Sequence, residues 1–563
     1  MNETIATDVT PAAWVDQVLE TYFRFRPVEA TLVGRHEADR RLPTFSREET
    51  DRYLGFLQDL LERRPDPAEP ITDPAVAMDL QLACGFIEME LARATTPQSW
   101  DRNPTIASGQ ALFAILSLLR RPYAPAQERL DAVVARLEVM PELLDVATSR
   151  LHEMPKPWID RARSDAHGLR LLLTDGLARF AVDHEASLHE AGDAIDRALE
   201  ALDRFVAFLE AAEAVADGSV PGCGQAVIEL ILDRAHALGG VDAVERAAFD
   251  ELEVRRRQLE QEASQLGFAT SGDALATLGH THPSRQTLVE RHVELFDAHR
   301  SVATEQGLVT WPDYPLHFVE PPAWLRPTMD HAVVYPYHAP APDDEQVPVE
   351  FLVPTPNENA TPEEVQGFLA AANDTVIKLN HIVHHGGIGH HVQNWYAYNR
   401  SRSAVGRIAA VDSAGHILML CGMTMAEGWA SYVPGLMAEA GFLTDVERLV
   451  LHADTHRAAT RAIVDVKLHS GRWTAEDAIG FLVAETGTST EAAQAAVTRL
   501  SLYPGTGSTY LMGPMSIRRI RGELCDGSSD GWSVQEFHDE LLSWGSVPVE
   551  LVARYLSDGV RIG

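Results

Sequence analysis

The most informative stretch of the chain is residues 361–391, which read TPEEVQGFLAAANDTVIKLNHIVHHGGIGHH. Thr361 and Glu364 form a capping box with a proline at the first helical position, so a helix is predicted to begin here. An apolar stripe at helical spacing then extends the pattern. Its members are Val365, Phe368, Leu369, Ala372, Val376 and Leu379. The helix is predicted to carry its register into His384 and His385.

Five of the 23 histidines lie within residues 381–391. A catalytic zinc ion prefers imidazole and carboxylate ligands and keeps one position open. On an ideal helix His384 and His390 would point to different sides, whereas His391 would return to the face of His384. The glycines between them favour a bulge or break that could bring His390 round. The residues alone leave the second histidine ligand open between His390 and His391.

A second candidate ligand stands in residues 425–432, MAEGWASY, which read as a buried helix. Glu427 would be costly to bury there without a partner, and either a salt bridge or a metal ion would serve. Together with the histidine cluster, this segment favours Glu427 as a metal ligand.

Helical patterns also dominate the rest of the chain. They fill roughly residues 75–95, 125–150, 185–215 and 225–265. Prolines crowd the region between about residues 310 and 360, where residues 347–353, VPVEFLV, form the best strand candidate. The sequence therefore predicts a mainly α protein. Residues 1–305 are predicted to form an N-terminal helical region and residues 306–563 a C-terminal metal-binding region, joined in one continuous body.

The composition excludes several classes of partner. The chain has 82 acidic and 47 basic residues and a net charge of -35, which would repel nucleic acid and anionic membrane surfaces. It shows neither a leader-like N-terminus nor a run of about 18 apolar residues, so a cytoplasmic location is predicted. The four cysteines show no CxxC spacing and suggest no disulfide framework. The oligomeric state is not indicated.

The two candidate segments resemble motifs of the bacterial family known as domain of unknown function 885. Members of that family carry HExxPGHHxQ followed by EGWAxY. This chain has HHGGIGHHVQ at residues 384–393 and EGWASY at residues 427–432. Residues 461–473, 503–513 and 537–548 resemble further family segments. The resemblance thus covers most of the chain.

The family is grouped with the zinc metallopeptidases of the HExxH superfamily. The resemblance therefore implies a large helical, metallopeptidase-like architecture with the metal at its centre and a small β element, residues 347–353, next to the active site. Carried over to this chain, the zinc ligands would be His384, His390 and Glu427. The match of the Gly-His pair to the family pattern favours His390 over His391.

Other side chains are predicted to surround the substrate. By resemblance, Tyr510 would donate a hydrogen bond to a developing oxyanion, and His469 or Asp465 would contact the substrate or support the site. Arg518 and Arg521 are candidates to bind a substrate carboxylate, because guanidinium pairs with carboxylate in a bidentate manner. Internal salt bridges are the alternative for these arginines.

One position departs from the family pattern: His385 replaces the glutamate that handles the proton of metal-bound water. Peptide hydrolysis is therefore not expected. The main prediction is a zinc-dependent, hydrolase-like or lyase enzyme that acts on a small molecule, with His385 as the acid/base because imidazole titrates near neutral pH. One alternative is a redox enzyme with iron or manganese bound by two histidines and one carboxylate. The other is a non-catalytic binding protein.

Overall fold

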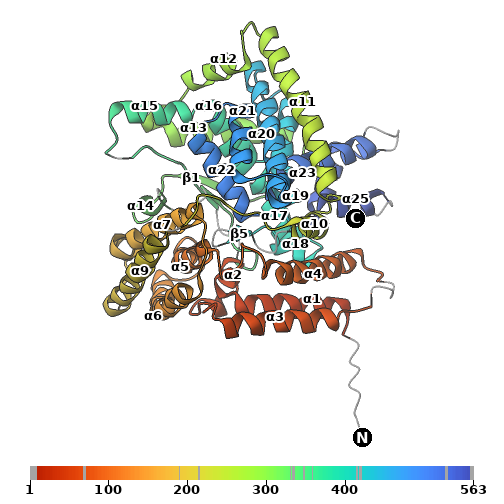
Figure 1. Cartoon of the computed structure of the whole chain (residues 1–563). Helices are drawn as coiled ribbons and strands as arrows, with labels where there is room; N and C mark the ends of the chain where they lie inside the picture. Colours follow the sequence, from red (N-terminus) through yellow and green to blue (C-terminus); the bar gives the residue numbers. More distant parts are fainter. Residues whose placement is uncertain are drawn as a thin grey trace.

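Helices dominate the computed structural model (Figure 1), which confirms the predicted mainly α fold. The structure describes residues 9–66, 71–188, 191–213, 216–329, 331, 336–345, 349–357, 359–413, 416–417, 421–525 and 531–557. The first helices are α1 (Pro11–Phe25), α2 (Pro27–Leu32), η1 (His36–Ala38), α3 (Arg47–Glu62), α4 (Pro74–Arg93), α5 (Pro104–Leu119), α6 (Ala126–Arg150), α7 (Lys156–Leu171), η2 (Leu172–Gly176), α8 (Leu177–Asp183) and α9 (Gly192–Glu213). Next come α10 (Gln225–Arg234), α11 (Val241–Gln265), α12 (Ser271–Ala276), η3 (Thr277–His280), η4 (Arg285–Thr287), α13 (Leu288–Glu305) and α14 (Arg326–Met329). The remaining helices are α15 (Pro362–Ala371), α16 (Asp374–Val376), η5 (Ile377–Gly386), α17 (His390–Arg400), α18 (Ala404–Ile408), α19 (Met423–Glu439), α20 (Asp445–His469), α21 (Ala475–Thr486), α22 (Thr490–Leu502), α23 (Thr506–Cys525), α24 (Val534–Leu542) and α25 (Val549–Ser557).

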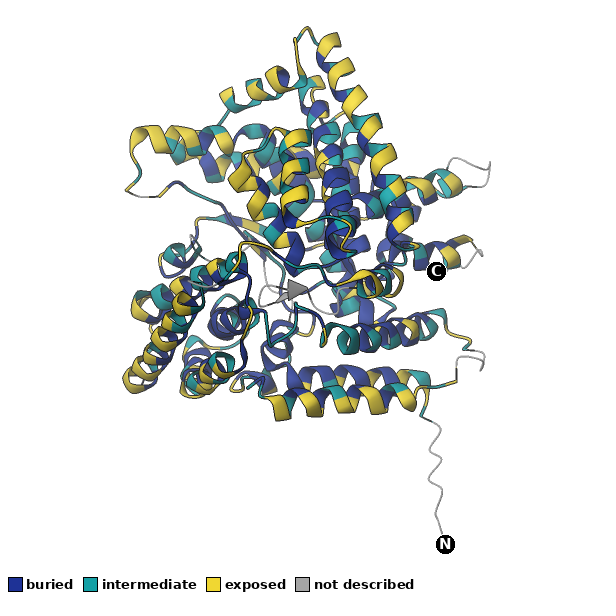
Figure 2. Cartoon of the chain, in the orientation of Figure 1, coloured by how far each residue is buried: buried dark blue, intermediate teal, exposed yellow. Residues whose placement is uncertain are grey.

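Helices from both predicted regions share one hydrophobic core. A single cluster of buried residues runs from Trp14 in α1 to Leu556 in α25. Helices α1–α9 form the lower part in Figure 1, and α11 and α19–α23 form the upper part, with the buried faces turned inward in Figure 2. Helix α11 packs along α20, and α13 packs against η5. Elements from residues 1–305 thus complete the surroundings of the predicted metal-binding region.

A small sheet lies beside the histidine segment. Strand β3 (Val349–Leu352) is central, with β1 (Leu316–Val319) parallel to it and β2 (Tyr337–His338) antiparallel. The strand expected at residues 347–353 is confirmed over β3, while residues 347 and 348 lie outside the described residues. The sheet shares a buried cluster with η5 and α13. A two-stranded ribbon, β4 (Asp412–Ser413) with β5 (His416–Ile417), is the other sheet described.

Two of the predicted helical stretches are interrupted. The stretch at residues 225–265 forms α10 and α11, because Gly239 and Gly240 between them adopt positive φ angles of 74° and 87°. The prediction of one unbroken helix from Thr361 into the histidines is also wrong, because α15 ends at Ala371. Asn373 caps a new start, accepting hydrogen bonds from the backbone N–H groups of the second and third residues after it. A π-helix, η5, then carries the histidines.

Helices α19 and α23 cross at their backbones. A Cβ atom built on Gly428 would lie 2.8 Å from the Cα of Gly513, and one built on Gly513 would lie 2.6 Å from the Cα of Gly428. No side chain fits between the helices at this point, since such contacts are shorter than any real Cβ makes. The crossing fixes the position of two of the predicted site residues, Glu427 just before Gly428 and Tyr510 one turn before Gly513.

We expect Gly513→Ala to lower the free energy of unfolding by about 1–3 kcal/mol, because the added methyl meets backbone atoms that cannot move aside. Gly522→Ala is the matched control on the same helix, since nothing lies within 4 Å of a Cβ at that position. The control should be neutral or slightly stabilising, because alanine favours a helix over glycine. Urea unfolding of both variants measures the difference. Equal stability of the two variants would contradict the close crossing.

Candidate metal centre

A tight turn brings the two ends of the histidine segment together. Helix η5 ends at Gly386 and α17 begins at His390, and a side chain on Gly389 would collide with the carbonyl of His384. The rings of His384 and His390 therefore lie edge to face, with centroids 4.9 Å apart and an angle of 88° between their planes. The break that the glycines predict is confirmed, and it brings His390 to the side of His384.

Two buried side chains hold this turn in place. The backbone N–H of Ile388 donates to Nε2 of His299, on α13, at 3.0 Å. The indole N–H of Trp429, on α19, donates to the carbonyl of Ile388 at 2.7 Å. Because Nε2 of His299 accepts a hydrogen bond, this ring is neutral, and burial lowers its pKa to about 3. A side chain on Gly387 would occupy the place of the His299 ring.

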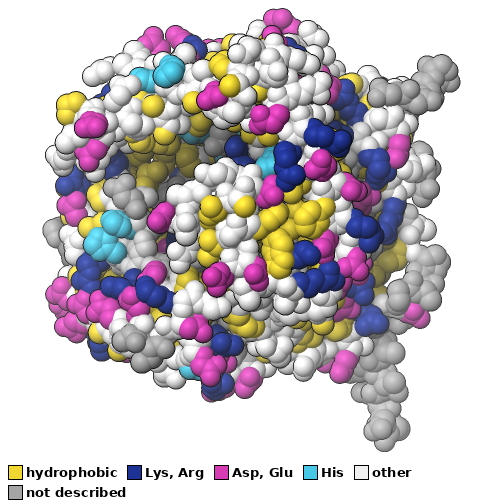
Figure 3. Space-filling view, turned by 45° about the horizontal axis from the view of Figure 1, so that its top comes forward, with side chains coloured by type: hydrophobic (Ala, Val, Ile, Leu, Met, Phe, Trp, Pro, Cys, Tyr) yellow, Lys and Arg dark blue, Asp and Glu magenta, His cyan; other side chains and the backbone are white. Residues whose placement is uncertain are grey.

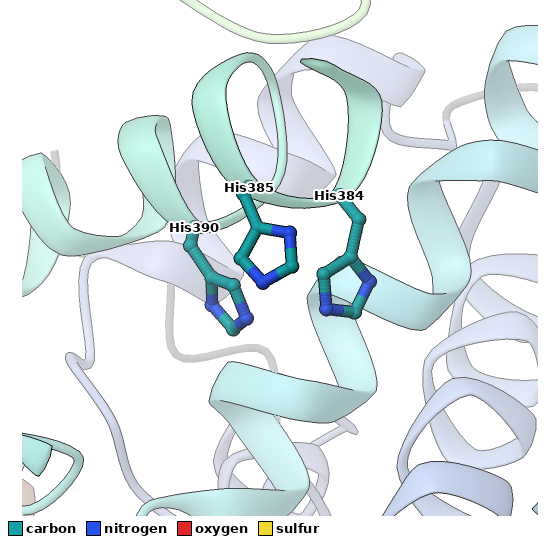
Figure 4. Close-up of side chains that lie close together, drawn as sticks. All are labelled: His384, His385 and His390. Carbon is teal, nitrogen blue, oxygen red and sulfur yellow. The ribbon is translucent and has the colours of Figure 1, made fainter. Parts of the chain in front are cut away.

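Three imidazoles converge on one point (Figure 4). The possible ligand atoms of His384, His385 and His390 all lie within 4.8 Å of one another. Glu427 approaches from α19, and its Oε2 is 3.6 Å from Nε2 of both His384 and His390. In the described structure this buried oxygen accepts no hydrogen bond. Among the described residues, Glu427 forms no comparable carboxylate–imidazole contact with His385.

Backbone carbonyls set the orientation of two rings. Nδ1 of His384 donates to the carbonyl of Ala430 at 3.0 Å, and Nδ1 of His385 donates to the carbonyl of Asn380 at 2.8 Å. Since a carbonyl only accepts, the proton of each ring in its neutral form sits on Nδ1, which leaves the lone pair on Nε2. The second bond spans five residues, as the wide turns of η5 allow. Both rings thus present an unprotonated nitrogen, as a metal ligand must.

Electrostatics favours the carboxylate form of Glu427 and the neutral form of His385. Burial raises the pKa of Glu427, yet the adjacent His384 and His390 rings outweigh it and hold that pKa well below its usual value. Burial lowers the pKa of His385, and the neighbouring rings lower it further. A carboxylate and neutral imidazoles are the forms that coordinate metals.

The donor set fits a divalent transition metal. Ligand atoms about 2.0–2.1 Å from a tetrahedral zinc ion lie about 3.4 Å from each other. The corresponding distances from Glu427 Oε2 to His384 Nε2 and His390 Nε2 are 3.6 Å. A buried carboxylate oxygen without a hydrogen bond is costly, and a cation between it and the two rings would remove that cost.

The remaining two histidines of the segment turn away from this centre. His391 is fully buried, its Nε2 donating to the carbonyl of Tyr314 at 2.8 Å and its Nδ1 accepting from the hydroxyl of Tyr337 at 3.3 Å. His381 shares a hydrogen bond of 3.0 Å with His292 on α13. Both ring nitrogens of His391 therefore form hydrogen bonds with tyrosines near the sheet. The structure does not bring His391 to the cluster as an alternative ligand.

The centre opens into a large cavity of about 1630 Å³. His384, His385, His390 and Glu427 line it, and so do Tyr510 and Arg518, two residues that were predicted to lie near a substrate. Figure 3 shows that one face of the molecule is hollowed, with hydrophobic side chains visible inside the hollow. A cavity of this size accommodates a drug-sized molecule.

Three predicted residues have other partners. His469 is fully buried, its Nε2 donating to the carbonyl of Leu500 at 3.0 Å, and Asp465 accepts from the backbone N–H of Ser508 at 2.9 Å. Asp465 thereby caps the start of α23, which carries Tyr510. Arg521 pairs with Glu439 at 2.8 Å. None of the three belongs to the cavity lining, so their placement indicates structural roles rather than contacts with a substrate.

Three residues at the cluster or in the cavity that it lines were not predicted from the sequence. Trp429 lies in the EGWASY segment. Its hydrogen bond to the carbonyl of Ile388 joins residues 41 positions apart, so no local sequence pattern predicts it. His299 resembles any other helical histidine. Arg461 also lines the cavity and opens the stretch of residues 461–473, so its motif position was the available signal.

The described residues contain no helix with the length and apolar character needed to cross a membrane.

No curated protein matches the chain. Two solved structures share its fold, and both are of candidate lipoproteins, the first of unknown function. The protein from Shewanella oneidensis is 19% identical with a TM-score of 0.76, covering 97% of this chain and 100% of its own. The protein from Colwellia psychrerythraea is 16% identical with a TM-score of 0.77, covering 98% of this chain and 99% of its own. The location of this chain in the cell stays a prediction. The model of the family "Bacterial protein of unknown function (DUF885)" matches residues 27–556, and the chain therefore belongs to that family.

Proposed function

We propose that this protein is a metal-dependent enzyme that acts on a small molecule, with the metal bound by His384, His390 and Glu427. The observation that carries the proposal is the arrangement of Glu427. Its buried Oε2 has no hydrogen bond in the described structure and lies 3.6 Å from one nitrogen of each of the two histidines. Three such donors beside a cavity match a catalytic zinc site with an open position.

The bound metal would act as a Lewis acid on a carbonyl or carboxylate oxygen of the substrate. The protein's own groups would do the rest. In the neutral ring Nε2 of His385 carries a lone pair at the edge of the centre, and we propose that it takes a proton from the reacting group. Tyr510 lines the same cavity and would donate a hydrogen bond to a developing oxyanion. We therefore favour hydrolase-like or lyase chemistry on a small molecule over peptide hydrolysis.

A redox enzyme is the second candidate, and one observation favours it. His385 lies within 4.8 Å of the other two imidazoles, so three histidines and one carboxylate are in reach of one ion. Four protein ligands would close a tetrahedral zinc site, whereas six-coordinate iron or manganese would keep two positions open. The two candidates therefore differ in whether His385 binds the metal.

We expect Glu427→Gln to lose most of the bound metal, because the amide removes the negative charge from the centre. The measurement is the metal content of purified protein after dialysis, by plasma mass spectrometry. Glu439→Gln is the matched control on the same helix, since Glu439 is exposed and pairs with Arg521. A full equivalent of metal in the Glu427→Gln protein would refute the ligand set.

For His385→Ala we expect the bound zinc to stay near one equivalent while turnover of small ester or amide substrates falls. General acid–base catalysis contributes about 10²–10⁴-fold, which sets the size of the expected loss. If the variant loses its metal, and the wild type carries iron or manganese and consumes oxygen, the redox candidate replaces the first. Unchanged turnover together with unchanged metal content would remove His385 from both schemes.

A further inference from the structure

Arginine side chains gather on one wall of the cavity. The cationic members of the lining from α11, α20, α22 and α23 are Arg255, Arg457, Arg461, Arg499 and Arg518. The chain as a whole is strongly acidic, with 82 acidic against 47 basic residues, so carboxylates that could neutralise these arginines are in excess. A cationic wall inside an acidic protein therefore needs an explanation.

Two of these arginines lack the internal partners that the others have. Arg255 pairs with Glu251 at 2.5 Å, and Arg457 pairs with Asp454. In contrast, the guanidinium groups of Arg461 and Arg518 form no ion pair or hydrogen bond with any residue that the structure describes. Both side chains are exposed, so each remains available to a molecule that enters the cavity.

The surroundings of Arg461 disfavour its charge. Partial enclosure by the protein lowers the pKa of Arg461, and the nearby cations Arg457 and Arg499 lower it further, while Tyr510 acts in the opposite direction. A cation held in this way gains from any anion that replaces the lost hydration and relieves the repulsion between the arginines. The pKa of Arg518 is lowered in the same way, first by partial enclosure among protein atoms and then by the cation Arg255, while Glu251 acts in the opposite direction.

Helix packing places Arg461 beside the start of α23. The carbonyl of Arg461 would lie 2.9 Å from a Cβ on Gly507, so α20 lies directly against the first turn of α23. Tyr510 follows one turn later, close to the crossing that positions Glu427. Arg518 lines the same face of α23, about 12 Å further along the helix axis at 1.5 Å per residue.

We propose that the cavity binds a small organic anion whose carboxylate or phosphate group pairs with Arg461. A planar guanidinium binds either oxyanion through two parallel N–H···O bonds. The anionic group would then hold the substrate beside Tyr510, with its reacting carbonyl turned toward His384 and Glu427, and Arg518 would attract the anion from the outer part of the cavity. The binding step stands on the arginines alone, while the role of the anion as a substrate rests on the proposed function.

The test is anion binding to the metal-free, full-length protein, measured by isothermal titration calorimetry with succinate and with inorganic phosphate at constant ionic strength set by chloride. We expect one of the two anions to bind, and the one that binds identifies the oxyanion. Arg461→Gln should weaken that binding about tenfold or more, because a hydrogen bond to a charged group is lost. Arg448→Gln is the matched control on α20, where Arg448 is half-exposed, pairs with Asp445 and lies outside the cavity lining.

Two outcomes would overturn the inference: no heat of binding from either anion in the wild type, or wild-type affinity in the Arg461→Gln protein. Thermal unfolding of both variants shows whether each is folded. Metal analysis of the same preparations separates this inference from the proposed function. A protein that binds metal but neither anion would refute only the anion site, whereas one that binds an anion through Arg461 but no metal would refute only the proposed function.

Discussion

The geometry of the centre depends on the backbone contact between α19 and α23 at Gly428 and Gly513. This contact sets the position of α19. The residues on either side of Gly428 then each make a different contact with the histidine segment. Glu427 reaches the histidines, Trp429 holds the carbonyl of Ile388, and the carbonyl of the next residue orients His384. One short helical segment thus carries the candidate ligand Glu427, holds the turn that carries His390, and orients the ring of His384. Small residues at the crossing are what allow this arrangement.

The π-helix and the glycine turn solve the remaining geometric problem. In a regular α-helix His384 and His390 would diverge. The wide turns of η5 let His385 bond to a carbonyl five residues earlier, and the turn before α17 folds His390 back toward His384. π-helical turns frequently occur at functional sites because they reorient side chains at a cost in backbone regularity. Here the cost is offset by the buried bonds from His299 and Trp429.

Local patterns predicted the features that depend on local physics. The capping box at Thr361, the strand around Val349 and the break at the glycines each have a cause within a few residues, and the structure has all three. Motif position also singled out the residues that converge. It could not separate a residue that faces the cavity from one that faces the backbone, because both lie in the same motifs. Asp465 caps a helix while Arg461, four residues earlier, lines the cavity. That distinction arises from packing between helices far apart in sequence. The helix interruption at Asn373 was also not predicted, because the apolar stripe continues through it at helical spacing.

The chain belongs to its family over residues 27–556, and we propose that His385 stands at the position that would handle the proton of a hydrolytic water. On this proposal, a change of one proton-transfer group would change the reaction while keeping the candidate metal site. The most direct test of the metal site is anomalous diffraction from crystals of the metal-loaded protein. We expect one peak within bonding distance of His384 Nε2, His390 Nε2 and Glu427 Oε2, facing the cavity. A metal bound through His391, or a peak only at other sites, would contradict this centre.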